Sequence, residues 1–130
     1  GTYTNFTFDS CAITGNALGG AKEGVGITIK ARDDGGYATF PAACADVLIT
    51  GCTITGNERG VRIGEPGKSN EGPTGVVLEN NVIADNVKTY TGTDGSAYGG
   101  VINVSQTQVD ANGNYWGEAT PNMAEHSPAM

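Results

Sequence analysis

Apolar residues occupy every second position in several short runs of this chain, and four of these runs align with one another without gaps. Such alternation is typical of β-strands, because successive side chains point to opposite faces of a strand. The aligned segments are 5–16 (NFTFDSCAITGN), 46–57 (DVLITGCTITGN), 75–86 (GVVLENNVIADN) and the more divergent 108–119 (QVDANGNYWGEA). A repeated core with unequal spacing predicts stacked repeats whose insertions lie in loops.

Four columns of this alignment are predicted to face inward. The first strand of each repeat supplies two columns: Phe6, Val47, Val76 and Val109, then Phe8, Ile49, Leu78 and Ala111. A second strand follows a one-residue turn at Ser10, Gly51, Asn80 and Gly113 and supplies two more: Cys11, Cys52, Asn81 and Asn114, then Ile13, Ile54, Ile83 and Trp116. The mixed position between the first two columns (Thr7, Leu48, Val77 and Asp110) should face outward.

Asparagine closes each of the first three repeats, at Asn16, Asn57 and Asn86. This residue tolerates the left-handed turn conformation, and stacked side-chain amides can hydrogen-bond from one repeat to the next. We therefore predict an asparagine column at this corner. The same stacking would bring the Cα atoms of Cys11 and Cys52 to roughly 5 Å, which leaves both a disulfide and a pair of buried thiols open.

A third strand is predicted after each repeat. Its matching positions are Ile27 and Ile29, Val61 and Ile63, and Ile102 and Val104, with Thr28, Arg62 and Asn103 pointing outward between them. Three short strands per repeat predict an all-β fold, a right-handed parallel β-helix (solenoid) of about three to four coils. We expect residues 1–117 to form the coils and residues 118–130 to form an irregular C-terminal capping tail. Nothing comparable covers the first coil, which is therefore expected to stack on further coils or on another chain.

Composition narrows the possible partners. The chain has 130 residues, 14 acidic against 7 basic side chains and a net charge of −7. A surface so poor in lysine and arginine releases few counterions, which argues against binding to nucleic acid or to an anionic membrane. No apolar run approaches the roughly 20 residues of a membrane span. Three cysteines are too few for a disulfide framework.

The repeats resemble those of pectate-lyase-like parallel β-helix proteins. The resemblance rests on segments 10–16 (SCAITGN), 51–57 (GCTITGN) and 80–86 (NNVIADN), followed by strands of the Gly-Val/Ile-x-Ile type. Segment 109–117 (VDANGNYWG) is similar to the terminal coil of many secreted bacterial and archaeal β-helix proteins. The resemblance implies a β-helix fold and an extracellular or cell-surface location. Because the family includes lyases, glycoside hydrolases, adhesins and modules without known activity, it does not choose a function.

Insertions are the expected place for function, because strand positions in a solenoid are committed to stacking. We predict a groove along the third strands, with the loops 30–45 and 64–74 as one wall. Aromatic faces beside hydrogen-bonding groups suit sugar rings. The expected ligand-binding residues are Lys30, Arg32, Tyr37, Arg62, Glu65, Tyr90, Tyr98 and Asn103. Two alternatives stay open: Arg62 could only pair with a nearby glutamate on the surface, and the tyrosines could only pack their loops.

Asp33 and Asp34 are the candidate catalytic residues, since paired carboxylates act as acid and as base or nucleophile in glycoside hydrolysis. A turn at Asp-Asp-Gly-Gly is the alternative role of this doublet. Pectin-cleaving hydrolases of the resembled family also carry a Gly-His-Gly segment and an Arg-x-Lys strand. The one histidine here, His126, lies in the tail, so those roles are not carried over.

No cofactor and no metal site is expected. The spacing of Asp110, Asn112 and Asn114 is similar to the start of a calcium loop, but the glycine and the final glutamate of such a loop are misplaced. Calcium at this segment is therefore kept only as an alternative.

Three functions follow as hypotheses. The favoured one is an extracellular module of a larger secreted or cell-surface protein, either glycan-binding or structural and adhesive, because the family's catalytic set is missing. The second is part of a carbohydrate-active enzyme, a glycoside hydrolase or polysaccharide lyase acting in the groove on the third-strand face. The third is a structural protein that stacks end to end through its first coil.

Overall fold

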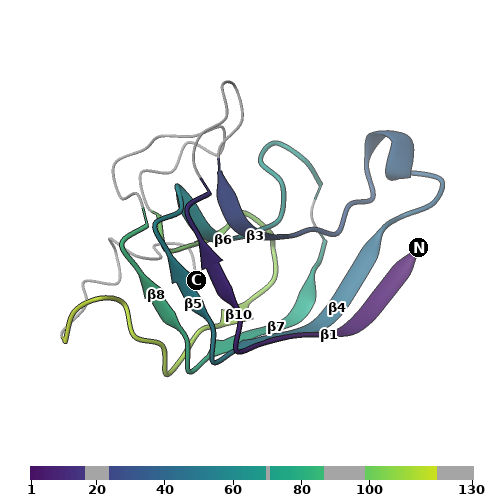
Figure 1. Ribbon diagram of the computed structural model, residues 1–130. Coiled ribbons are helices and arrows are strands. Elements are labelled where there is room, and N and C mark those ends of the chain that lie inside the picture. Colours follow the sequence, from purple (N-terminus) through teal and green to yellow (C-terminus); the bar gives the residue numbers. More distant parts are fainter. Residues whose placement is uncertain (17–23, 70, 87–98, 120–130) are drawn as a thin grey trace.

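Successive strands along the chain belong to three different parallel sheets, which the chain visits in the same order (Figure 1). The computed structural model describes residues 1–16, 24–69, 71–86 and 99–119. The first sheet contains β1 (Thr2–Asp9), β4 (Ala43–Thr50), β7 (Thr74–Glu79) and β10 (Val109–Asp110). The second contains β2 (Ala12–Thr14), β5 (Thr53–Thr55) and β8 (Val82–Ala84), and the third contains β3 (Val25–Ile29), β6 (Arg59–Ile63) and β9 (Val101–Asn103).

Each run of three strands is called a coil here. Coil 1 contains β1–β3, coil 2 contains β4–β6 and coil 3 contains β7–β9, while β10 begins a fourth. The only helical segment in the described ranges is the short 3₁₀ turn η1 (Gly35–Tyr37). The all-β fold of stacked parallel strands is therefore confirmed. Beyond residue 119 the predicted capping tail lies outside the described residues.

The register of the first two sheets follows the predicted columns. Phe6 pairs with Val47 and Val47 with Val76, which in turn pairs with Val109. In the second sheet, the three isoleucines at positions 13, 54 and 83 pair in succession. Like residues recur in the sequence because they occupy the same place in successive coils.

Burial rises sharply from coil 1 to coil 2. The side chains of Phe6 and Phe8 are 43% and 36% exposed, whereas Val47 and Ile49 in the same columns are 2% and 0% exposed. Coil 2 lies between coils 1 and 3, whereas in the described ranges coil 1 has a neighbouring coil on one side only. Each aliphatic side chain buried in this way contributes roughly 1.5–3 kcal/mol, so most of the core energy comes from coils 2 and 3. Trp116, 6% exposed, packs in the same core.

An asparagine ladder fastens the coils at one corner. The Oδ1 of Asn57 accepts hydrogen bonds from the backbone N–H (3.1 Å) and the side-chain amide (2.7 Å) of Asn16. The Oδ1 of Asn86 accepts the same two groups from Asn57, at 3.0 and 3.1 Å. Their Nδ2 groups donate to the carbonyls of Ile13 and Ile54, both at 3.0 Å. Each amide therefore binds the coil before it, which confirms the predicted column.

A second ladder combines cysteine and asparagine. The Oδ1 of Asn81 accepts the backbone N–H of Cys52 at 2.9 Å, and the Oδ1 of Asn114 accepts that of Asn81 at 3.0 Å. One coil earlier, the Cys52 sulfur takes the acceptor's place for the Cys11 N–H at 3.4 Å. Cys11, Cys44 and Cys52 are all free, so the stacked pair is two thiols and not a disulfide. Burial raises the pKa of the Cys52 thiol.

The third sheet departs from the predicted register in coil 3. β3 and β6 pair as expected. In β9, however, Val101 lies opposite Val61, and Asn103 lies opposite Ile63. A slip of one residue exchanges the two faces of a strand, so the predicted outward position of Asn103 is wrong. Its side chain is 8% exposed, and its amide donates to the Thr107 carbonyl at 2.7 Å.

Left-handed backbone conformations recur at three columns, one of which, Gly15, Gly56 and Asp85, has φ of 71°, 66° and 53°. The predicted one-residue turn is confirmed, with φ of 53°, 61°, 57° and 73° at Ser10, Gly51, Asn80 and Gly113. The remaining column, Asn5, Asp46 and Gly75, has φ of 59°, 56° and 61°, and the sequence did not predict it. The first sheet bends at this column. The initial parts of β1 and β4 lie side by side at the end of the sheet that contains the N-terminus (Figure 1). The bent part of β4 borders the candidate site.

Candidate functional site

The loops that follow β3 and β6 are joined to each other across adjacent coils. The first loop folds back on itself through an antiparallel bridge between Arg32 and Ala42. It is attached to the second loop by another antiparallel bridge, between Ala31 and Gly72. Two loops far apart in the sequence therefore form one surface, as expected from the stacking of their coils.

Four charged side chains pair with one another on this surface. The guanidinium of Arg32 contacts the Asp34 carboxylate at 2.7 Å and the Glu65 carboxylate at 3.1 Å. Glu65 also contacts the ammonium of Lys30 at 3.4 Å. The second oxygen of Asp34 accepts the backbone N–H of Ser69 at 3.1 Å. Arg32 and Asp34 thus link the loop of coil 1 to the loop of coil 2.

These contacts shift the pKa values of three groups within the cluster in the direction that favours the charged form of each. The Ser69 N–H and then Arg32 lower the pKa of the Asp34 carboxyl. Burial acts to raise the pKa of Glu65, but Lys30 and Arg32 outweigh it, and the net shift is downward. The hydrogen bond to Asp34 raises the pKa of Arg32. Asp34, Glu65 and Arg32 are therefore charged at neutral pH, and opposite charges face each other within the cluster.

An aromatic ring stands beside this cluster. The Arg32 guanidinium lies over the ring of Tyr37, 5.1 Å from its centroid, and Tyr37 remains 44% exposed. A depression of about 240 Å³ opens here, lined by Lys30, Arg32, Tyr37, Ala42 and Glu65, and we call it the charged depression. It presents an apolar ring face next to ammonium, guanidinium and carboxylate groups, which are the elements that recognise a sugar ring and its hydroxyls.

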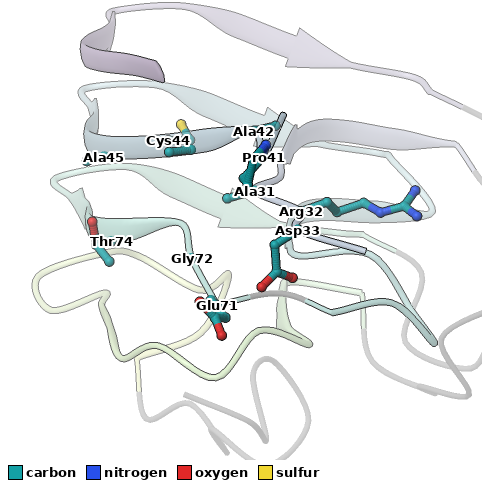
Figure 2. A pocket seen from close by; sticks show the side chains of 11 residues that line it. Ala31, Arg32, Asp33, Pro41, Ala42, Cys44, Ala45, Glu71, Gly72 and Thr74 are labelled. Carbon is teal, nitrogen blue, oxygen red and sulfur yellow. The ribbon is translucent and has the colours of Figure 1, made fainter. Parts of the chain in front are cut away.

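A second hollow, of about 230 Å³, shares Arg32 and Ala42 with the charged depression, and we call it the alanine pocket. It is lined by Ala31, Arg32, Asp33, Pro41, Ala42, Ala43, Cys44, Ala45, Glu71, Gly72 and Thr74. Figure 2 shows the Arg32 side chain extending to one side, while the Asp33 carboxylate points toward Glu71. Arg32 therefore borders both hollows, whereas Asp33 lines only the alanine pocket.

The Asp33 carboxylate in the lining of the alanine pocket has an unusual hydrogen-bonding environment. Its Oδ1 atom is shielded from solvent and has no hydrogen-bond partner within the part of the chain that the structure describes. Buried polar atoms are nearly always hydrogen-bonded, so an exception of this kind identifies a position where a donor from a ligand or water is favoured. Burial also raises the pKa of the Cys44 thiol in the lining.

The structure brings together only part of the predicted ligand-binding set. Lys30, Arg32, Tyr37 and Glu65 all line the charged depression. Arg62 lies on β6 in register with Thr28 and Ile102 and does not line it. The buried Asn103 holds a turn through its bonds to Ser105 and Thr107, so it does not form the floor of a groove. Tyr90 and Tyr98, with most of the two long insertions before the third strands, lie outside the described residues, as does His126.

Some residues of this region were missed from the sequence. Arg59, which the third-strand prediction did not include, begins β6 and is fully buried. The signal was available, because Arg59, Val61 and Ile63 alternate on one face of a strand. Glu71 and Ala42 carried no signal, since their place depends on how two irregular loops meet.

Local hydrogen bonds account for the polar side chains of the segment that was kept as a calcium alternative. The Asp110 carboxylate accepts the backbone and side-chain N–H groups of Asn112 at 3.1 and 2.6 Å, while Asn114 belongs to the second ladder. In the described ranges, no three His, Cys, Asp or Glu side chains are grouped so that they could hold a metal ion. Nor does any described helix have the length and apolar character of a membrane span.

Comparison with known proteins does not assign the chain: no protein-family model, curated protein or solved structure matches it.

Proposed function

We propose that this chain is a carbohydrate-binding section of a right-handed parallel β-helix of the pectate-lyase-like type, within a larger secreted or cell-surface protein. In this proposal an uncharged sugar occupies the charged depression. The observation that carries it is the half-exposed ring of Tyr37, held by Arg32 beside charged groups that pair with each other. A module with a purely structural or adhesive role would bind no ligand at the Tyr37 ring.

The depression suits one sugar ring. Its volume, about 240 Å³, is below the roughly 300–1,000 Å³ of sites for drug-sized ligands, so it matches a single ring of a glycan whose remainder stays in solvent. The guanidinium restrains the Tyr37 ring before any ligand arrives, and such pre-organisation reduces the entropy lost on binding. Glu65 can accept, and Lys30 can donate, hydrogen bonds from and to the hydroxyls.

Charge favours an uncharged glycan over a polyuronate. Lys30 and Arg32 are balanced by Asp34 and Glu65, so the depression has no excess positive charge. The chain as a whole carries −7 and would repel a polymer of carboxylates. This electrostatic balance argues against the lyase alternative, which would act on an acidic chain.

A glycoside hydrolase is the second candidate, and one observation favours it. The shielded Oδ1 of Asp33 has no donor among the described residues, and such a carboxylate is suited to accept a proton or a hydrogen bond from a substrate hydroxyl. Asp34 is less suited to be the general acid, because Ser69 and Arg32 lower its pKa and keep it ionised. Asp33 and Asp34 stay predictions as a catalytic pair.

The test is a screen of the full chain against a glycan array, followed by calorimetry with the best uncharged glycan. Tyr37→Ala is expected to weaken binding by about tenfold or more, since roughly 1.4 kcal/mol of ring contact corresponds to that factor. Phe40→Ala is the matched control, because Phe40 is in the same loop, is 77% exposed and does not line the depression. An equal loss in both variants, or no bound glycan in the array, would refute the proposal.

Release of reducing sugar from the bound glycan separates the two candidates. The binding module is expected to release none. Turnover that Asp33→Asn abolishes, with binding retained, would establish the enzyme instead.

A further inference from the structure

At one end of the coil stack, three strand edges have no partner strand among the residues that the structure describes. β1, β2 and β3 are the edge strands of their respective sheets. On this end, which we call the coil-1 face, Tyr3, Phe6 and Phe8 are 60%, 43% and 36% exposed. A hollow of about 250 Å³ lies among Tyr3, Phe6, Phe8, Ile27, Thr28, Ile29, Lys30, Cys44 and Val47. Exposed apolar side chains on a free strand edge are the usual mark of an interaction surface.

The coil-1 face continues an interface that already exists inside the molecule. Phe6 and Phe8 stand in the columns of Val47 and Ile49, which are 2% and 0% exposed beneath coil 1. The surface between coils 1 and 2 therefore shows what a complementary surface looks like. It consists of a parallel strand with two apolar side chains, two residues apart, in register over the same columns.

The asparagine ladder gives a second and independent indication. Within the ladder, each Oδ1 receives the backbone N–H and the amide of the preceding coil: Asn57 from Asn16, and Asn86 from Asn57. Asn16 donates its amide to Asn57, but in the described part of the chain its own Oδ1 receives no hydrogen bond. This unfilled acceptor lies in the position where the ladder would bind an N–H from another coil.

We propose that the coil-1 face docks one further coil of parallel β-strands. That coil carries apolar side chains over Phe6 and Phe8, and an asparagine or another residue with a free N–H over Asn16 Oδ1. A second copy meeting this face through its own first coil fits less well. Its strands would run antiparallel, its Asn16 would offer a second acceptor rather than a donor, and two chains of −7 repel each other.

The experiment supplies such a coil within a full-length chain. A duplicate of residues 43–71 is fused ahead of Thr2, because Thr4, Ala45 and Thr74 share one column and this junction preserves the natural spacing. Hydrogen exchange of the β1 and β2 amides is the readout. The docked coil is expected to slow this exchange by about tenfold or more relative to the unmodified chain, since the edge becomes paired.

The matched control is the same fusion in which only the duplicated copies of Val47 and Ile49 are changed to Asn, and it should leave the exchange of β1 unchanged. Asn16→Ala in the unaltered fusion should remove part of the added protection, whereas Thr14→Ala on the neighbouring strand should not. The proposal is overturned if the β1 amides exchange equally fast in the fusion and in its control. A fusion that fails to fold also overturns it. So does a concentration-dependent dimer of the unmodified chain that Phe6→Asp abolishes, because the face would then belong to a second copy.

Discussion

Replacing Asn57 by aspartate tests whether the asparagine ladder stabilises the stack through its amide donors. The Asn57 side chain is fully buried, and its Nδ2 donates to the Ile13 carbonyl at 3.0 Å and to Asn86 Oδ1 at 3.1 Å. Asn57→Asp keeps the shape and the Oδ1 acceptor, but it places a carboxylate oxygen against two acceptors. Each buried acceptor that loses its donor costs about 1–3 kcal/mol, and the buried charge adds to this. We expect a loss of about 3–5 kcal/mol at pH 7, a large part of the roughly 5–15 kcal/mol typical of a domain.

The pH dependence of this loss is its distinguishing feature. Burial and the facing acceptors raise the pKa of the introduced carboxyl above its unfolded value, so the protonated form is favoured in the folded state. Stability should therefore return as the pH falls through that raised pKa, because the protonated carboxyl can again donate one hydrogen bond. Urea unfolding of the variant and the wild type between pH 7 and pH 5 measures the difference at each pH.

Asn16→Asp is the control, since it makes the same chemical change at an exposed position of the same ladder. Water can solvate its carboxylate, and we expect a loss of about 1 kcal/mol or less. The reasoning is refuted if Asn57→Asp is as stable as the wild type at pH 7, or if its deficit does not depend on pH.

Two further predictions follow from burial and from the ion-pair cluster. Ile54→Ala should cost about 2–5 kcal/mol in urea unfolding, because Ile54 is fully buried, whereas Phe6→Ala at the 43%-exposed end should cost clearly less; equal costs would contradict the described burial gradient. Asp34 and Glu65 have pKa values lowered from 3.8 and 4.5. Their stabilisation should be complete above pH 4.5 and lost as the pH falls through the lowered values, so an Asp34→Asn chain should show a weaker acid dependence between pH 4.5 and pH 2.

The inward columns of the first two sheets were predictable because each depends on a local property. Alternation determines which face of a strand a residue occupies, and repetition determines its partner in the next coil. Phe8, Ile49 and Leu78 needed no further information to be placed in one column. The asparagine ladder was predictable for the same reason, since only stacking explains why an amide recurs at one corner.

The register of β9 was not predictable, because its local pattern permits two faces. Val101, Ile102 and Val104 are all apolar, so alternation does not distinguish the inward from the outward set. The bend at Asn5, Asp46 and Gly75 was missed for a related reason. Three different residue types share one left-handed conformation, and no single type identifies it.

For the first two sheets, the residue pattern alone was enough to predict which residues stack and which side chains face the core, because strand alternation and coil repetition act over short distances. The contacts made by the loops depend instead on how the coils pack against each other. Arg32 contacts Glu65 because their coils are adjacent, while Asp33 lines the alanine pocket and its neighbour Asp34 pairs with Arg32. The irregular loops have no repeating spacing from which such contacts could be inferred, so the candidate site depends on the packing of whole coils.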